Sequence, residues 1–318
     1  MNNNQRYADF CTQNPDMPVF LQDWWLDIVY CRNWDALFVE QDGRIIAAMP
    51  YSIKQKWGFR LIFSPPFTPT AGFWIAYPQG IGQIRKISFE NQIMSDFAKQ
   101  LDNLKIAFYS HYYSFHYTNW FGYYWKSFCQ TTRYTYRIDL TPSWESIEAK
   151  IHNKTKRVIR ISSQSLNVKL NSISVSEFWD TNKKSFDRQS VEVPYSYAIF
   201  EAMMTKSLER NLGLALHTTD DRGQIIACLF VVFDSHTCHA VLCGTDPKLR
   251  DSNATTLLYY EAIRYAKEKN MSFFDFSGSM IEGVESFYRH FGAEQTPYHL
   301  IEKQYSKIYS LLRDIRHR

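Results

Sequence analysis

Two segments of the chain, 180 residues apart, share one pattern of apolar and polar positions. Residues 36–49 read ALFVEQDGRIIAAM and residues 216–229 read LHTTDDRGQIIACL, so that Gly43 coincides with Gly223. Each segment consists of a short strand, a turn that contains glycine and an apolar strand, which is typical of a β-hairpin. The repeated pattern predicts an internal duplication in which each copy opens with such a hairpin.

The elements that follow each hairpin come in the same order. A strand and then a loop follow at residues 58–72 and 237–253, and apolar positions at helical spacing predict helices over 84–104 and 255–270. An apolar strand over 271–276 follows the second helix. This order predicts an α/β (α+β) chain of two related domains, each a mixed sheet flanked by helices.

The junction between the two domains is predicted near residues 140–175, with the domain boundary at residue 140. Residues 134–140 alternate as a strand, and a helix is expected to follow as far as Arg160, with Thr141 at its N-cap and Pro142 at its first position. Further helices are expected at 174–186, where Ser174 and Glu177 form a capping box, at 197–210 and at 306–318, and a strand at 298–302. The predicted domains are residues 1–140 and 141–318.

Composition limits the class of protein. Of the 318 residues, 45% are hydrophobic and 21% are charged, which supports a packed core and excludes wholesale disorder. The longest apolar run, Ile225 to Phe233, is too short to span a bilayer as a helix, and the polar N-terminus predicts no secretory signal. The cysteines form no C-x-x-C pair, so we expect free thiols in a reducing cytoplasm.

The familiar motifs of phosphate loops, serine hydrolases and zinc proteases are absent from the sequence. His236 and His239 have no third ligand at a suitable spacing, so no metal site is expected. The net charge of +4 is too small to indicate a nucleic-acid binder by itself. Three stretches of the second domain remain as candidates for ligand binding or catalysis.

The first stretch, residues 246–255, is a loop that leads into a helix. The backbone N–H groups and the dipole at a helix N-terminus favour a phosphate or a carboxylate, and Arg250 adds charge. The alternative is an ordinary helix cap by Ser252 or Asn253.

The second stretch, residues 274–293, begins as a strand that stops at Ser277-Gly278, where small side chains leave room for a ligand. Phe287 and Phe291 of the helix that follows are expected in the core, whereas Tyr288 is a candidate for the site.

The third stretch, residues 150–170, carries six basic residues and no acidic one. It is either a solvated helix face or a positive wall for a phosphorylated substrate or an RNA end.

Aromatic residues are concentrated in residues 108–125, where eleven of eighteen residues are aromatic. A strand pair here would bury one aromatic face, and the other face would line an acceptor cleft or the domain interface.

The end of the chain resembles the GNAT acyltransferase superfamily, in which a strand, a loop of the type [QR]-x-x-G-x-[GA] and a helix bind the pyrophosphate of acyl-CoA. Residues 250–255, RDSNAT, fill that loop, and residues 287–293, FYRHFGA, match a helix end F-Y-x-x-x-G-F/A. Asn253 and Thr255 stand where glycine and a small residue are expected, so their side chains would crowd a tight pyrophosphate cradle.

The order of motifs is more similar to the FemABX branch, the peptidoglycan-type aminoacyltransferases. A strand and a helix K-T-x-R-x-x-R in that branch are matched by YRIDL at 136–140 and NKTKRVIR at 153–160. A strand with G-[ST], a helix and D-F-x-G are matched at 243–245 and 275–278. The resemblance covers most of residues 20–305.

The resemblance implies two tandem GNAT-like domains that transfer an acyl or aminoacyl group to an amine in a cleft between them, without a covalent enzyme intermediate. The donor substrate would be acyl-CoA or aminoacyl-tRNA, with no permanently bound cofactor, and the acceptor a small molecule or a cell-envelope precursor. Tyr288 would donate a proton to the leaving group, and Lys303 would stabilise the carbonyl oxygen. Asp275 or Glu282 would take the proton of the amine.

Binding residues follow from the same resemblance. In the second domain, the donor is expected to contact Arg250, Asn253, Ala254, Thr255, Ser277 and Gly278, and its phosphates to meet Lys154, Arg157 and Arg160. The proline-rich loop at 64–70 lacks the N–H donors that a phosphate site needs, so the first domain is expected to bind the acceptor. The acceptor residues assigned there are Pro66, Phe67, Thr68, Trp74 and Trp120.

Two other functions stay open at this point. The chain is alternatively a degenerate transferase that only binds a glycan or peptide through its aromatic side chains. It is alternatively an RNA-end binder that uses the basic stretch, in which case binding depends steeply on salt.

Overall fold

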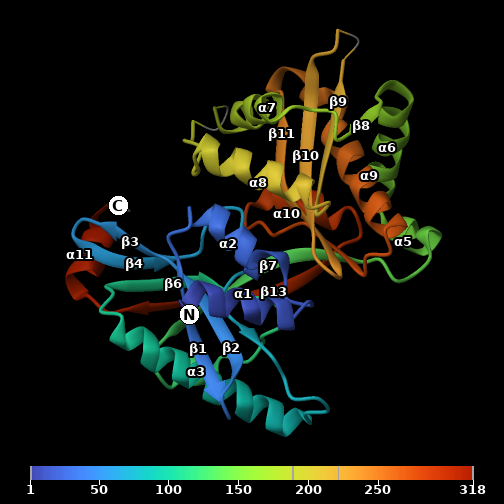
Figure 1. Cartoon of the computed structure of the whole chain (residues 1–318). Helices are drawn as coiled ribbons and strands as arrows, with labels where there is room; N and C mark the ends of the chain where they lie inside the picture. Colours follow the sequence, from blue (N-terminus) through green and yellow to red (C-terminus); the bar gives the residue numbers. More distant parts are fainter. Residues whose placement is uncertain (1, 188–189, 221, 317–318) are drawn as a thin grey trace. The chain divides into compact units, whose positions relative to one another are not determined.

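The computed structural model describes residues 2–187, 190–220 and 222–316 of the chain (Figure 1). The chain forms two compact units: unit 1 contains Met1–Arg133 and Pro297–Arg318, and unit 2 contains Tyr134–Thr296. The sequence predicted a boundary near residue 140 with the whole C-terminal segment in the second domain. In the structure this segment is part of unit 1, where Leu300–Gln304 pair antiparallel with Phe108–Tyr112.

Unit 1 contains an antiparallel sheet, a further group of mixed strand pairs and flanking helices. Its elements are α1 (Asn3–Gln13), η1 (Val19–Leu21), α2 (Asp23–Val29), β1 (Asp35–Gln41), β2 (Arg44–Tyr51), β3 (Ile53–Lys56), β4 (Phe59–Phe63), β5 (Trp74–Ile75), α3 (Gln83–Asn103), β6 (Phe108–Tyr112), α4 (Phe121–Tyr124), the end of β13 (Glu294–Gln304) and α11 (Lys307–Arg316). Strands β1, β2 and β5 form an antiparallel sheet. Strand β4 is parallel to β6, and β3 and β13 pair antiparallel with β4 and β6.

The aromatic segment 108–125 builds the core of unit 1. Only Phe108–Tyr112 is a strand, and a loop and the short helix α4 follow it, so the segment does not form the strand pair considered above. Tyr109, Tyr113 and Tyr123 are buried, and their hydroxyls form a chain with O···O distances of 2.6 and 3.0 Å. Eleven of the eighteen residues are aromatic without a period of two, so the hydrophobicity of this segment cannot distinguish a strand from packed loops.

Unit 2 is a mixed sheet flanked by helices. Strand β7 (Cys129–Asp139) leads into it, and its further elements are α5 (Trp144–Lys150), α6 (Asn153–Ser165), β8 (Val168–Leu170), α7 (Val175–Asp187), α8 (Tyr197–Glu209), β9 (Gly213–Thr219), β10 (Ile225–Phe233), β11 (Thr237–Thr245), η2 (Pro247–Ser252), α9 (Ala254–Glu268), β12 (Phe273–Asp275) and α10 (Glu282–Arg289). The strands lie in the order β7-β12-β11-β10-β9-β8. Strands β11 and β12 are parallel, and the other described pairs are antiparallel.

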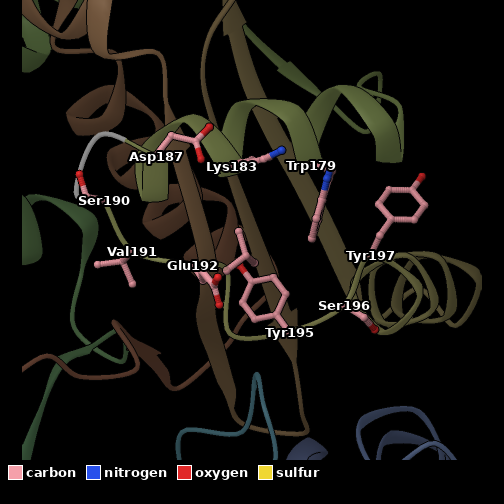
Figure 2. A pocket seen from close by; sticks show the side chains of 10 residues that line it. Trp179, Lys183, Asp187, Ser190, Val191, Glu192, Tyr195, Ser196 and Tyr197 are labelled. Atoms are coloured by element: carbon pink, nitrogen blue, oxygen red, sulfur yellow. The ribbon is translucent and has the colours of Figure 1, made fainter. Parts of the chain in front are cut away.

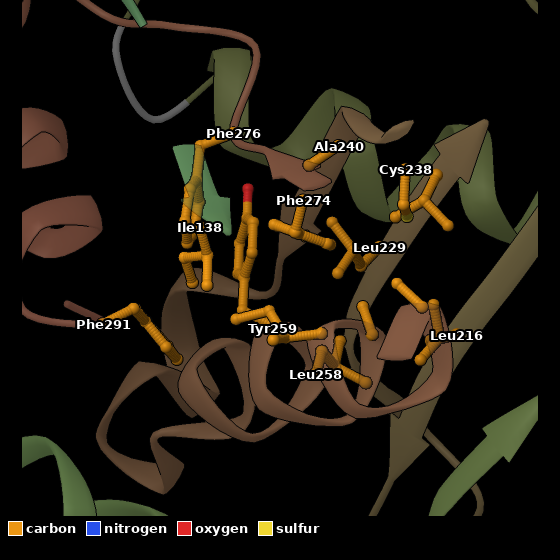
Figure 3. Packing of buried hydrophobic residues seen from close by; sticks show 14 of the residues in the cluster. Ile138, Leu216, Leu229, Cys238, Ala240, Leu258, Tyr259, Phe274, Phe276 and Phe291 are labelled. Carbon is orange, nitrogen blue, oxygen red and sulfur yellow. The ribbon is translucent and has the colours of Figure 1, made fainter. Parts of the chain in front are cut away.

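The sheet of unit 2 is covered on both faces, which explains the unbroken apolar run in β10. Leu229 and Val231 belong to the core that α9 closes, which Figure 3 shows from close by. Phe230, on the opposite face, packs against Phe178 of α7, with ring centroids 6.3 Å apart. Successive side chains of a strand point to opposite faces, so a strand buried on both faces is apolar at every position.

Several local predictions are confirmed. Both hairpins form, and Gly43 and Gly223 both have positive φ angles, of 75° and 81°. The capping box of α7 forms, since the Glu177 N–H donates to Ser174 Oγ at 3.2 Å and Glu177 Oε2 accepts from the Ser174 N–H at 2.8 Å.

The helix expected from Thr141 to Arg160 is corrected in two respects. It is divided into α5 and α6 by an extended Ile151, with φ of −67° and ψ of 134°. The N-cap of α5 is Ser143, not Thr141, because the Ser143 hydroxyl accepts from the Ser146 N–H and Thr141 instead bonds to Asp139. No described helix combines the length and apolar character needed to cross a membrane.

Candidate functional site

A cavity of about 750 Å³ lies within unit 2, where strands β11 and β12 separate. Their parallel pairing ends at His239 and Asp275. The next residue after β12, Phe276, donates its N–H to the carbonyl oxygen of Tyr136 in β7 at 3.0 Å. The chain after β12 therefore follows β7, and the two parallel strands diverge.

The separation leaves one edge of β11 facing the cavity. Beyond His239, β11 continues to Thr245 and pairs with β10. Ala240 to Cys243 line the cavity on that edge. A β-bulge places Val241 between the pairs Val231–Ala240 and Phe230–Leu242, which bends the strand beside the cavity. An unpaired strand edge offers backbone donors and acceptors to an extended ligand.

The N-terminus of α9 forms the second wall of the cavity. Asn253 has φ of 57° in the left-handed region, which asparagine tolerates better than most residues with a side chain. The Thr255 hydroxyl lies 2.8 Å from the hydroxyl of Thr245 at the end of β11, and all three residues line the cavity. Asn253 thus has a left-handed conformation at the position where the family pattern has glycine, and Ala254, the next residue, is buried.

The loop between β11 and α9 is fixed by a buried carboxylate that the sequence did not single out. Asp246 Oδ2 accepts from Lys184 Nζ at 2.8 Å and from Gln224 Nε2 at 3.1 Å, and Oδ1 accepts from the Lys248 N–H. The hydrogen bond from Lys184 holds the pKa of Asp246 below its usual range. The side chain of Arg250, in the same loop, lies outside the described part of the structure.

Ser277 and Gly278 form a left-handed turn after β12, with φ of 60° and 78°. Both line the cavity, and Ser277 Oγ is buried without a hydrogen-bond partner among the described residues. Asp275 holds this turn, because its Oδ1 accepts from the Ser277 N–H at 2.7 Å and also from the Thr135 hydroxyl. Its Oδ2 lies 3.6 Å from Arg137 Nε. Asp275 is buried behind the turn and does not line the cavity.

Tyr288 lies in the cavity wall with its ring centroid 4.5 Å from that of Phe276. Burial raises the pKa of Tyr288 to about 12, so its hydroxyl is protonated at neutral pH and suited to donate a proton. Tyr259 lines the same wall, and its hydroxyl points away from α9 (Figure 3). Burial raises the pKa of Cys243 to about 12 as well, which makes its thiol a poor nucleophile.

No described residue that lines the cavity carries a charge. Its polar groups are the hydroxyls of Ser185, Thr245, Thr255, Thr256, Tyr259, Ser277 and Tyr288, the Cys243 thiol and the amides of Asn182 and Asn253. Glu282 is exposed in the first turn of α10 and does not line the cavity. Lys154, Arg157 and Arg160 are exposed on α6 and do not line it either.

Lys303 and the acceptor residues assigned from the sequence belong to unit 1. Lys303 Nζ lies 2.7 Å from Asp102 Oδ1. The hydroxyl of buried Thr68 accepts from Trp25 Nε1 and donates to the carbonyl oxygen of Pro66, both at 3.0 Å. The other three are placed as follows: Phe67 has φ of 56°, Trp74 Nε1 donates to Asn14 Oδ1 at 3.3 Å, and Trp120 packs against the core.

Sequence reasoning missed the part of the cavity that α7 supplies. Asn182, Ser185 and Phe186 line it, and helix α7 crosses β11 at Gly244. A side chain at Gly244 would meet the backbone of Asn182, so glycine permits this close approach. A glycine inside a strand pattern is the one sequence signal that could have indicated such an approach.

A comparison with protein families places the cavity in a known domain. Residues 149–289 match the family described as "Acetyltransferase (GNAT) domain", and this range contains every described residue that lines the cavity. The prediction of an acyltransferase is confirmed by this match. A search of curated protein sequences finds no significant match.

Solved structures agree on the fold. FemX is similar with a TM-score of 0.69 and 12% identity, over 93% of this chain and 95% of that one. The C-terminal domain of a putative lysylphosphatidylglycerol synthetase from Agrobacterium fabrum has a TM-score of 0.62 and 11% identity, over 98% and 96% of the chains. L-PGS from Bacillus licheniformis has a TM-score of 0.62 and 9% identity, over 99% and 97%. The resemblance to the FemABX-like branch of the GNAT superfamily is confirmed at the level of the fold.

Proposed function

We propose that this chain, an acyltransferase with a GNAT domain, transfers an acyl group from acyl-CoA to an amine in the cavity of unit 2. The observation that carries the proposal is the open edge of β11 beside Tyr288 in one uncharged cavity. The pantetheine arm of coenzyme A is an extended chain with amide groups, which suits pairing with a strand edge. Its thioester would then reach the wall that contains Tyr288.

The reaction needs few groups from the protein. The neutral amine attacks the thioester carbonyl carbon, and the resulting oxyanion accepts hydrogen bonds from the β11 edge and the Ser277 hydroxyl. The carbon–sulfur bond then breaks, and Tyr288 donates its proton to the leaving sulfur. The amine nitrogen, now part of an amide, gives its surplus proton back to the tyrosinate, which restores Tyr288.

The roles of the predicted acids change in this proposal. Asp275 is a positioning residue, because both of its carboxylate oxygens already contact Thr135, Arg137 and the turn that it holds. Glu282 and Lys303 have no part in this scheme. Direct attack fits the half-buried Cys243, whose raised pKa disfavours a covalent thioester intermediate.

The donor and acceptor are proposed from the site and its relatives. The described residues that line the cavity carry no charge, which favours an acyl thioester over an aminoacyl group, whose ammonium would need a carboxylate partner. Aminoacyl-tRNA, the acceptor residues of unit 1, a cleft between the domains and a cytoplasmic location stay predictions. Because one similar structure is named as a domain of a putative lysylphosphatidylglycerol synthetase, amine-bearing lipids and envelope precursors are the first acceptors to test.

The test is incubation of the chain with acetyl-CoA and longer acyl-CoA donors and a panel of amines. We expect release of free coenzyme A thiol that depends on the amine, and an acylated amine detected by mass spectrometry. Aminoacyl-tRNA donors run in parallel. The proposal is wrong if no donor is turned over and no donor raises the melting temperature of the protein.

A further inference from the structure

A second cavity of about 540 Å³ lies in unit 2, between α7 and the loop that leads into α8. Three aromatic rings line it: Trp179 on α7, Tyr195 in the loop and Tyr197 at the start of α8. The Trp179 ring lies 6.1 Å from the Tyr195 ring at 68° and 5.3 Å from the Tyr197 ring at 87°. The rings therefore form a corner and not a flat platform.

Two carboxylates lie in the same wall. Asp187 belongs to the last turn of α7 and Glu192 to the loop that follows, and both line the cavity (Figure 2). Both are exposed. Lys183 is the only cationic side chain among the described lining residues, so these residues carry a formal charge of −1. The described lining residues thus combine aromatic rings with a formal charge of −1.

We propose that this cavity binds an alkylammonium group, either quaternary or protonated. Aromatic faces attract cations through their quadrupoles, and several rings set at steep angles surround a compact cation. The carboxylates of Asp187 and Glu192 add long-range attraction for a cation and none for a neutral ligand.

The site adjoins the acyl-transfer cavity through α7. Asn182 lines the larger cavity, and its Nδ2 donates to the Tyr195 hydroxyl at 2.7 Å. Phe186 also lines the larger cavity, and its ring lies 6.1 Å from that of Tyr195. A caged ammonium is held in its charged form and has no lone pair for attack. The bound group is therefore a cationic group other than the amine that is acylated.

The experiment measures binding and does not depend on acyl transfer. Tetramethylammonium chloride is titrated into the full chain at constant ionic strength, with neopentyl alcohol as a neutral ligand of similar shape, by calorimetry or ligand-observed NMR. We expect saturable binding of the cation and much weaker binding of the alcohol. Trp179→Leu is expected to weaken cation binding about ten-fold, and the exposed change Glu192→Gln a few-fold.

Trp144→Leu is the matched control. Trp144 also packs against a tyrosine edge-to-face, with its ring 5.5 Å from that of Tyr260, but it does not line this cavity. Melting curves check that each variant is folded. The proposal is overturned if the alcohol binds as well as the cation, if no saturable cation binding is found, or if the Trp144 variant loses as much affinity as the Trp179 variant. None of these results bears on whether acyl-CoA is turned over.

Discussion

Gly244 in β11 sits beneath α7, where the helix forms part of the acyl-transfer cavity. An added Cβ would lie 2.7 Å from Cα and 2.8 Å from the backbone nitrogen of Asn182. Both atoms belong to the helix backbone, so no side-chain rotation can relieve the contact. The substitution Gly244→Ala therefore forces α7 away from the sheet.

The size of the effect follows from these distances. Comfortable contacts between such atoms are about 3.5–4.0 Å, so α7 must move by roughly 1 Å. Overpacking of this kind typically costs about 1–3 kcal/mol. Each kcal/mol lowers the melting temperature of a unit of this size by about 2–4 °C. Asn182, Ser185 and Phe186 move with the helix, so we also expect weaker binding of the acyl donor.

The assay compares thermal unfolding and donor affinity of Gly244→Ala with those of Gly283→Ala. Gly283 lines the same cavity from α10, and a Cβ there would meet nothing within 4 Å. Because alanine is the better helix former, Gly283→Ala should be neutral or stabilising by up to about 1 kcal/mol. Equal stability and equal donor affinity for Gly244→Ala and the wild type would refute the close approach of α7 to β11.

Two further variants test the loop and the chemistry. Asp246→Asn should lower stability at pH 7 by about 1–3 kcal/mol, because the buried partner of Lys184 is lost. The pKa of Asp246 is depressed in the folded state, so its stabilisation is present above the unfolded pKa and is lost as pH falls through the folded value. Between pH 7 and pH 3, the free energy of unfolding should therefore fall less steeply for Asp246→Asn than for the wild type. An equally steep fall in both proteins would contradict this. Cys243→Ala should keep most of the acyl transfer in a thiol-release assay, whereas complete loss would indicate a covalent intermediate on that thiol.

Elements with a clear period or a local signal were predictable from the sequence. The hairpins, the capping box of α7 and the long helices α3 and α9 each depend on residues that are close in sequence. The break between α5 and α6 was not predictable from periodicity. It depends on tertiary contacts, such as the hydrogen bond from the His152 N–H to the carbonyl oxygen of His290.

The candidate site was predictable in part. Thr255, Ser277 and Tyr288 lie together in the cavity, because strand ends and helix starts meet at one edge of an α/β sheet. Asp275 has the residue type of a proton acceptor, and only its contacts with Thr135 and the Ser277 N–H show that it holds the turn. The part of the cavity wall that α7 supplies was not predictable. It depends on the packing of α7 on β11, two elements far apart in the sequence, and no local sequence pattern indicates this contact.

The kinetics of Tyr288→Phe test the central claim most directly. Burial raises the pKa of Tyr288 to about 12, so its hydroxyl is protonated at pH 7 and available as a proton donor. The variant keeps the ring and its packing and loses only the hydroxyl. We predict an unchanged dissociation constant for the acyl-CoA donor and a kcat about a hundred- to ten-thousand-fold lower. An unchanged kcat for Tyr288→Phe would contradict the account.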